Sequence, residues 1–146
     1  MTTMRKFVSI VVVLGIGAVV LGETGLQSHL YNEVVTSDSE IGQAFANRAS
    51  DVQVEGSGQV VRVLTDDVNG DRHQRFILRI SSGQTLLVAH NIDLAPRLPQ
   101  LQVGDTVEFF GEYEWNDQGG VVHWTHRDSQ GRHVDGWLRN NGKTYQ

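Results

Sequence analysis

The chain has 146 residues, of which 39% are apolar and 20% charged, and its formal charge is -5. A chain of this length and composition is expected to fold as one globular domain, and its apolar content argues against general disorder. It contains no cysteine, which excludes a disulfide scaffold, thiolate metal ligands and a cysteine nucleophile.

The first 22 residues have the pattern of an export segment. Two cations, Arg5 and Lys6, precede an apolar run over residues 7–21, as in a secretory signal peptide. A membrane-spanning helix usually has about 20 apolar residues, and no clear cleavage pattern precedes Glu23, so a cleaved signal peptide and an uncleaved membrane anchor both fit. We expect an exported protein, periplasmic or secreted, with an inner-membrane tether through residues 7–21 if the leader is kept.

The charge of the exported part argues against one class of partner. Removal of residues 1–22 leaves ten Lys and Arg against 17 Asp and Glu, a formal charge of -7. Proteins that bind nucleic acids non-specifically neutralise phosphates with a basic surface. General DNA or RNA binding is therefore disfavoured.

A polar spacer and a short helix are predicted next. Residues 23–38 are mixed and polar and form the expected spacer, and the folded domain is expected over residues 39–146. Asp38 or Ser39 is the predicted N-cap of the helix. The helix is expected to close one end of the domain with the apolar face formed by Ile41, Ala44 and Phe45.

From Val52 onward, alternating apolar and polar residues indicate short strands joined by turns. Three strands are predicted first, with the Asn69-Gly70 dipeptide as a hairpin signal between the first two. A connection over residues 91–103 contains both prolines and leaves room for at most a short helix. With two further strands after it, the predicted strands cover residues 59–65, 73–80, 84–90, 104–115 and 121–125.

This order of strands predicts an oligonucleotide/oligosaccharide-binding (OB) fold, which is a five-stranded, partly open Greek-key barrel. Gly56, Gly58 and Gly111 fall where strongly curved strands leave no room for a side chain. An immunoglobulin-like sandwich is the alternative, but it usually has seven strands. We predict a mainly all-β protein with an OB-like barrel, a short N-terminal helix and the N-terminal hydrophobic segment.

Five segments spread over residues 40–146 carry a resemblance to a known family. They are HQRF (73–76), AHNIDLAPR (89–97), GEYEWN (111–116), GGVVHWTH (119–126) and GW (136–137). Together they resemble a bacterial group of small exported proteins catalogued as a domain of unknown function. The resemblance implies a secreted or periplasmic single-domain protein with an OB-like barrel, and it assigns no activity.

The C-terminal histidines suggest a metal site. Imidazole and carboxylate groups are ordinary zinc ligands, and three of them leave one tetrahedral position for water. His123 and His126 face opposite sides of a regular strand, whereas the turn after Asp128 can return His133 toward His126. A divalent, zinc-like ion is therefore predicted on His126, Asp128 and His133. In that mechanism His73 or His123 is the candidate catalytic base. The alternative is that His123 and His133 make ordinary hydrogen bonds.

A second polar group surrounds the end of the third predicted strand. Arginine can hold a carboxylate or phosphate with two hydrogen bonds, and loops at this position present ligands in OB folds. Asp93 is expected to cap a short helix. Trp124 is expected in the core, and Trp137 as an exposed stacking platform. The predicted ligand-binding residues are Arg75, His90, Asn91, Arg97 and Trp137.

Three functions fit the sequence. The favoured one is a binding module that holds a small anionic or saccharide-like ligand, or a partner protein, on the open barrel face. The alternative is a metal-dependent hydrolase, with phosphodiester cleavage as the leading chemistry. The third is a structural envelope protein that makes only protein contacts. The standard hydrolase and nucleotide-binding motifs are absent from the sequence, so it does not decide whether the protein is an enzyme.

Overall fold

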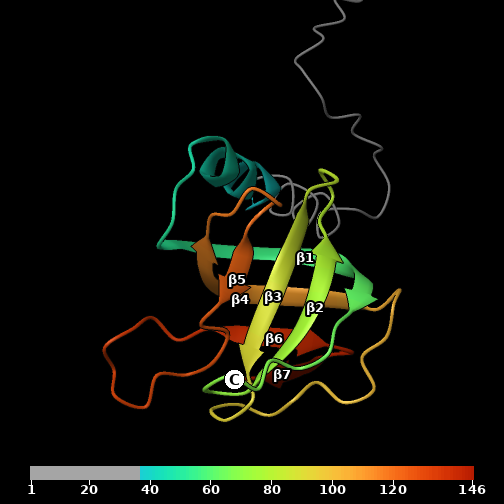
Figure 1. Cartoon of the computed structure of the whole chain (residues 1–146), viewed down its shortest axis with the longest axis vertical. Coiled ribbons are helices and arrows are strands. Elements are labelled where there is room, and N and C mark those ends of the chain that lie inside the picture. Colours follow the sequence, from blue (N-terminus) through green and yellow to red (C-terminus); the bar gives the residue numbers. More distant parts are fainter. Residues whose placement is uncertain (1–36) are drawn as a thin grey trace, which may run out of the picture.

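The computed structural model describes residues 37–146, which contain one helix over residues 37–46 and seven strands (Figure 1). The predicted export segment and nearly all of the spacer lie outside these residues. No helix in the described part has the length and hydropathy needed to cross a membrane. The strands are β1 (Val52–Val63), β2 (His73–Arg79), β3 (Thr85–Asn91), β4 (Thr106–Glu114), β5 (Val121–His123), β6 (Trp137–Asn140) and β7 (Lys143–Tyr145).

Strands β1 to β5 close into a barrel. They are hydrogen-bonded in the order β1-β2-β3-β5-β4, and β4 pairs back onto β1. Only the β3–β5 pair is parallel. β1 reaches both neighbours because it is long and is bent by an irregularity between Val60 and Arg62. The predicted OB-like barrel is therefore confirmed.

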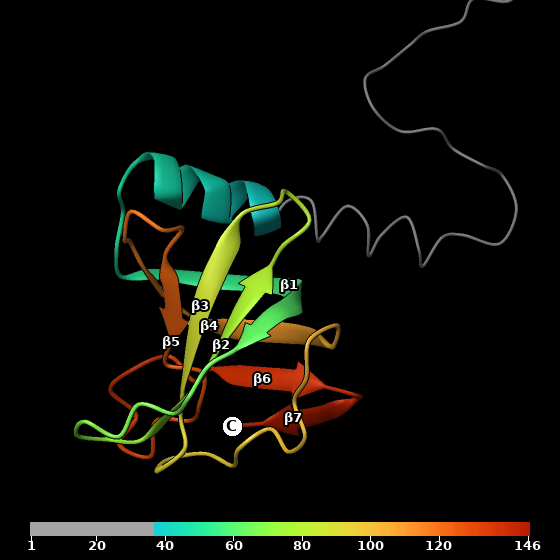
Figure 2. The same cartoon turned by 45° about the vertical axis from the view of Figure 1, so that its right-hand side comes forward.

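Alternate residues of the strands point into the barrel and form its core. The helix of residues 37–46 adds Ile41 and Ala44 to this core and lies at one end of the barrel (Figure 2). The close approaches predicted at Gly56, Gly58 and Gly111 are confirmed, since an added Cβ at each would lie 3.0 Å or less from a neighbouring atom. Fully buried core residues of the strands include Val60, Phe76, Leu78, Leu86, Val88, Val107, Phe109, Tyr113 and Val122.

Asp38 has a different role from the predicted one. It lies inside the helix and is buried. Its Oδ2 accepts hydrogen bonds from the Ser81 hydroxyl and, at 3.1 Å, from the Ser82 backbone N–H. Asp38 therefore ties the helix to the β2–β3 turn.

The hairpin formed by β6 and β7 extends the sheet beyond the barrel. β6 pairs with β4, and β7 pairs with β6, in both cases antiparallel. Asn141 and Gly142 join the two strands with φ angles of 51° and 74°, as expected for a type I′ turn. The sequence analysis did not predict these two short strands.

Gln74 fixes the β3–β4 connection against β2. Its Nε2 donates to the Leu98 carbonyl at 3.0 Å, and its Oε1 accepts from the Leu98 N–H at 2.9 Å. Both residues are buried.

The Gln74→Met substitution keeps most of the side-chain volume but leaves both backbone groups of Leu98 without a partner. We expect urea unfolding to show a loss of about 2 kcal/mol. The exposed Gln59→Met is the control, expected within about 0.5 kcal/mol of the parent; equal stabilities of the two variants would contradict this role of Gln74.

Candidate functional site

The outer surface of β2, β3 and β5 forms one continuous face. Cross-strand pairs such as His73 with Asn91 and Arg75 with Ala89 place alternate side chains on this surface. The corresponding face carries the ligand in OB folds. We call it the β2–β3–β5 face; its outward residues are His73, Arg75, Ile77, Arg79, Thr85, Leu87, Ala89, Asn91, Val121 and His123.

A pocket of about 220 Å³ lies at one end of this face. It gathers three imidazole rings from β2, from the end of β5 and from the loop that follows β5. Drug-sized ligands usually occupy about 300–1,000 Å³, so this pocket suits a small ligand or one ring of a longer one. We call it the histidine pocket; its lining residues are Asp71, His73, Ala89, Asn91, Leu94, His123, Trp124 and His126.

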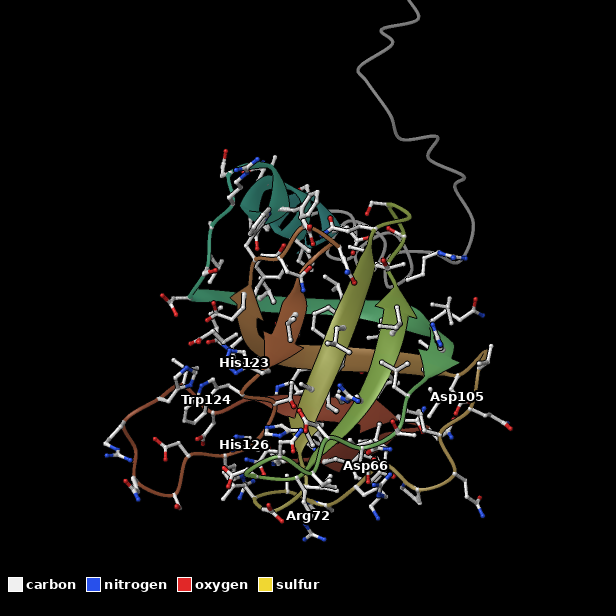
Figure 3. All side chains as sticks on the ribbon, viewed as in Figure 1. Asp66, Arg72, Asp105, His123, Trp124 and His126 are labelled. Carbon is white, nitrogen blue, oxygen red and sulfur yellow. The ribbon has the colours of Figure 1, made fainter. Side chains whose placement is uncertain are left out.

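Trp124 explains how His123 and His126 line the same pocket. β5 ends at His123, and Trp124 adopts a φ of 52°, which turns the backbone out of the strand. Figure 3 shows His123, Trp124 and His126 at this end of β5. Trp124 is half-buried and contributes to the pocket, so its predicted place in the core is wrong.

His73 and His126 are held with one ring nitrogen on a backbone carbonyl. Nδ1 of His73 lies 2.8 Å from the Asp71 oxygen, and Nδ1 of His126 lies 2.8 Å from the Arg127 oxygen. A carbonyl can only accept, so each Nδ1 carries the hydrogen. In the neutral form of each ring, Nε2 therefore keeps its lone pair and can accept a hydrogen bond.

His90 does not belong to the ligand surface. Its ring is fully buried; Nδ1 lies 2.8 Å from the Thr125 hydroxyl and Nε2 lies 3.0 Å from the Pro96 carbonyl. Burial lowers the pKa of His90 to about 4. The Pro96 hydrogen bond opposes this shift, and the nearby positive charge of Arg97 adds to it. The ring is therefore neutral at pH 7, donating to Pro96 and accepting from Thr125. It joins β3 to two loops and cannot touch a ligand on the outer face.

The short helix that Asp93 was predicted to cap is a turn in the structure, and Asn91 rather than Asp93 accepts the backbone hydrogen bonds at its start. The Oδ1 of Asn91 accepts from the backbone N–H groups of Asp93 at 2.9 Å and Leu94 at 3.2 Å. Asp93 instead binds Arg72, whose backbone N–H and Nε each lie 2.7 Å from the carboxylate. These hydrogen bonds lower the pKa of Asp93 below its ordinary value. Asn91 still lines the histidine pocket.

The two predicted arginines differ in availability. Arg97 forms an ion pair with Asp66 of the β1–β2 connection. Arg75 is half-buried on the β2–β3–β5 face, where its Nε donates to the Thr65 carbonyl at 3.1 Å. Within residues 37–146, Arg75 has no carboxylate in ion-pair contact. Arg75 therefore provides an uncompensated positive charge on this face.

Trp137 lies elsewhere in the sheet. It is on β6, where the Arg139 guanidinium sits 4.8 Å from its ring centroid and Phe110 packs beside it at 6.3 Å. It does not line the histidine pocket. The structure therefore separates Trp137 from Asn91, which the sequence analysis had grouped with it as a ligand-binding residue.

The predicted metal ligands His126, Asp128 and His133 do not come together. Among residues 37–146, these three do not form a group whose ligand atoms lie within 4.8 Å of one another. The Asp128 carboxylate instead accepts backbone N–H groups of Gln130, Arg132 and His133 at 2.7–2.9 Å, which lowers its pKa. Asp128 therefore shapes the loop, because the turn offers its carboxylate donors from its own backbone.

His133 binds Glu112 and stacks on Trp124. Its Nε2 lies 2.5 Å from Glu112 Oε2, and its Nδ1 lies 2.8 Å from the Val134 carbonyl. The ring centroids of His133 and Trp124 are 4.0 Å apart with an angle of 8°. Partial burial lowers the pKa of His133, but the two acceptors outweigh it and the pKa is raised above its ordinary value. Two acceptors require two ring hydrogens, so His133 is an imidazolium in this arrangement.

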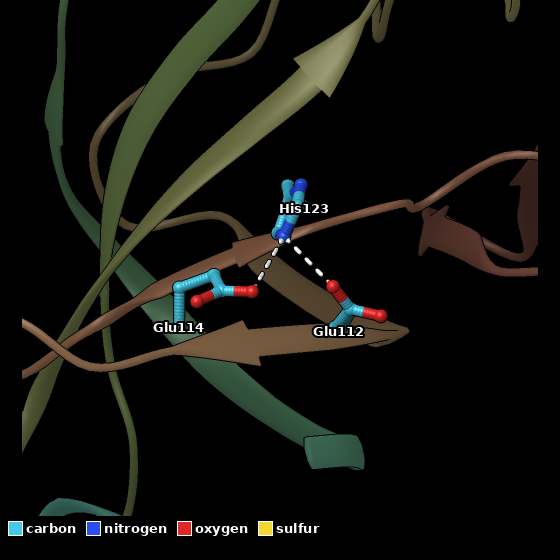
Figure 4. A group of neighbouring side chains, drawn as sticks. All are labelled: Glu112, Glu114 and His123. Atoms are coloured by element: carbon cyan, nitrogen blue, oxygen red, sulfur yellow. Dashed lines mark ion pairs between the residues drawn. The ribbon is translucent and has the colours of Figure 1, made fainter. Parts of the chain in front are cut away.

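A group of metal-ligand type is formed by Glu112, Glu114 and His123 (Figure 4). His123 Nε2 lies 3.3 Å from Glu112 Oε1 and 3.6 Å from Glu114 Oε1. Sequence reasoning found His123 but missed the two glutamates. The available signal was their spacing, since residues 112 and 114 lie on the same side of a strand.

Strand pairing brings the side chains of Glu112, Glu114 and His123 together. Glu112 is the direct partner of His123 in the β4–β5 ladder. Gly111 allows the close approach, because an added Cβ there would lie 2.5 Å from the His123 carbonyl oxygen. The side chains project outward from the barrel, opposite to the buried Tyr113.

A protein-family model described as "Protein of unknown function (DUF3465)" matches residues 25–146. None of the curated proteins compared with the chain matches it. The family match includes the whole barrel, the β6–β7 hairpin and every residue of the histidine pocket. The chain therefore belongs to this family of unknown function.

Proposed function

We propose that the protein is an exported binding module that holds a small saccharide-like ligand in the histidine pocket and along the β2–β3–β5 face. Export is proposed from the two cations and the apolar run of residues 7–21. The binding role is carried by one observation. Three imidazoles, one from β2 and two from the end of β5 and the loop after it, meet a tryptophan, a carboxylate and an amide in one pocket on the ligand-bearing face of an OB-like barrel.

The chemistry of the pocket suits hydroxyl groups. The Nε2 atoms of His73 and His126 can accept hydrogen bonds, and Asp71 adds a carboxylate acceptor. Leu94, which is 60% exposed, and Trp124 add apolar surface at the pocket. A sugar ring presents both hydroxyl groups and C–H faces, and therefore matches this mixture.

The carboxylates in and beside the histidine pocket favour a neutral ligand over a polyanion. Asp71 lines it, and the carboxylates of Glu112 and Glu114 lie beside His123 at its edge. Arg75, on the same face, can accommodate one acidic substituent of a longer ligand. Hydrolysis through His126, Asp128 and His133 is not supported, because the loop backbone takes up the Asp128 carboxylate.

Calorimetric titration with glucose, N-acetylglucosamine, galacturonate and their short oligomers tests the proposal. We expect saturable binding of at least one probe, weakened about tenfold by His73→Ala through loss of one hydrogen bond. Arg75→Ala should weaken the galacturonate series alone. The matched control is Arg139→Ala on β6, which should change nothing. Absence of binding by every probe, or equal affinities for His73→Ala and the parent, would contradict the proposal.

A further inference from the structure

We infer that Glu112, Glu114 and His123 form a binding site for a divalent cation of the zinc type. The site lies on the outside of the barrel where β4 and β5 pair, next to the histidine pocket through the shared His123. It does not depend on the proposed saccharide ligand. It also differs from the metal site predicted from sequence, with which it shares no residue.

The spacing of the three ligand atoms matches a tetrahedral ion. With metal–ligand distances of about 2.1 Å, two ligands of a tetrahedral zinc lie about 3.4 Å apart. The two distances from His123 Nε2 to the glutamate oxygens are 3.3 and 3.6 Å. The oxygens of Glu112 and Glu114 lie within 4.8 Å of each other. Small movements of the side chains are therefore enough to enclose an ion.

His123 supplies an independent sign of a missing ligand. Its Nε2 is buried and lacks a hydrogen bond of acceptable geometry, although it points toward both carboxylates (Figure 4). A buried polar atom without a partner is unfavourable. Two carboxylates placed this close also repel each other unless a positive charge lies between them. A divalent cation would satisfy the nitrogen and both oxygens together.

Neighbouring side chains hold the Glu112 carboxylate in place, as the residues around a metal site do for its ligands. The second oxygen of Glu112 accepts the hydrogen bond from His133 Nε2, and the His133 ring is held by stacking on Trp124. Such outer contacts orient ligating carboxylates. Three protein ligands leave the fourth position for water, the arrangement of zinc sites that act as Lewis acids. A protonated His123 between two glutamates is the competing explanation of the same geometry.

The test uses the full-length protein, purified without a histidine tag and stripped of metal. Zn²⁺ is titrated by calorimetry, and Co²⁺ is titrated by its visible absorption. We expect one equivalent of each ion and the strong bands of tetrahedral cobalt. The loss of a residue that only orients a metal ligand typically weakens metal binding by roughly 10- to 100-fold. Glu114→Gln and His123→Gln each remove a ligand, so each should weaken Zn²⁺ binding by more than this. Circular dichroism of each variant confirms that it is folded.

Two variants serve as controls. Glu108→Gln removes a carboxylate from the same strand, where it pairs with Arg139, and His126→Gln removes another imidazole of the pocket. Both should bind Zn²⁺ like the parent. The inference is overturned if no equivalent is bound, if Glu114→Gln and His123→Gln keep the parent affinity, or if His126→Gln abolishes binding. If saccharide binding depends on His73 but not on Glu114, the proposed function stands even when the zinc titration overturns the metal site.

Discussion

Acidification from pH 6.5 to pH 4 is expected to lower the free energy of unfolding by about 3 kcal/mol through His90. In the unfolded chain His90 regains its ordinary pKa of 6.5, whereas burial holds it near 4 in the folded protein. Between these values the unfolded state binds a proton that the folded state excludes. The contribution of His90 is therefore complete above pH 6.5, falls with pH, and changes no further below pH 4.

Urea unfolding across this pH range, for the parent and His90→Gln, measures the effect. Glutamine cannot titrate, so the variant should show a flatter dependence on pH between 6.5 and 4. His133→Gln is the matched control. Its folded pKa is raised, so its stabilisation is present below the unfolded pKa and is lost as pH rises through the folded pKa. This control should keep the acid slope of the parent. Identical acid slopes for His90→Gln and the parent would show that His90 is not the titrating group.

The Gly136→Ala substitution is expected to reduce stability by at least about 3 kcal/mol. An added Cβ would lie 1.9 Å from the carbonyl oxygen of Trp124 and 2.7 Å from that of Phe110. Both are backbone atoms, so no side-chain rotation can relieve the contact, and the chain on both sides must move. Thermal and urea unfolding give the size of the loss.

Gly42→Ala is the control for Gly136→Ala. It lies in the helix with no atom within 4 Å of an added Cβ, so its stability should match the parent or exceed it by about 0.5–1 kcal/mol. Gly136→Ala should also displace Trp124 and weaken the binding of any pocket ligand. A Gly136→Ala variant as stable as Gly42→Ala would contradict the close packing of this loop.

The barrel was predictable because its signals are local and repeated. Alternation along residues 73–80 and the turn at Asn69-Gly70 are visible in the sequence, and the number and spacing of strands narrow the topology. The β6–β7 hairpin was missed, although Asn141-Gly142 is an equally good turn signal. Its strands have only four and three residues, which is too few to show a clear alternation.

The candidate site was only partly predictable because it depends on contacts between distant segments. The sequence indicated His73, His123 and His126 one by one, but their meeting requires the positive φ of Trp124, and tryptophan is not a residue that signals such a conformation. The glutamates of β4 looked like ordinary solvated positions. Only the pairing of β4 with β5 reveals that Glu112 lies opposite His123.

The most direct test of the central claim is to follow the histidine and tryptophan ring signals and the backbone amide signals by NMR during a saccharide titration. The rings of His73, His123 and His126 line one pocket, whereas His90 is sealed in the interior. Binding at the histidine pocket should shift the first three together and leave His90 nearly unchanged. Shifts confined to Trp137 and the rest of β6, with the three pocket rings unaffected, would place the ligand elsewhere and contradict the account.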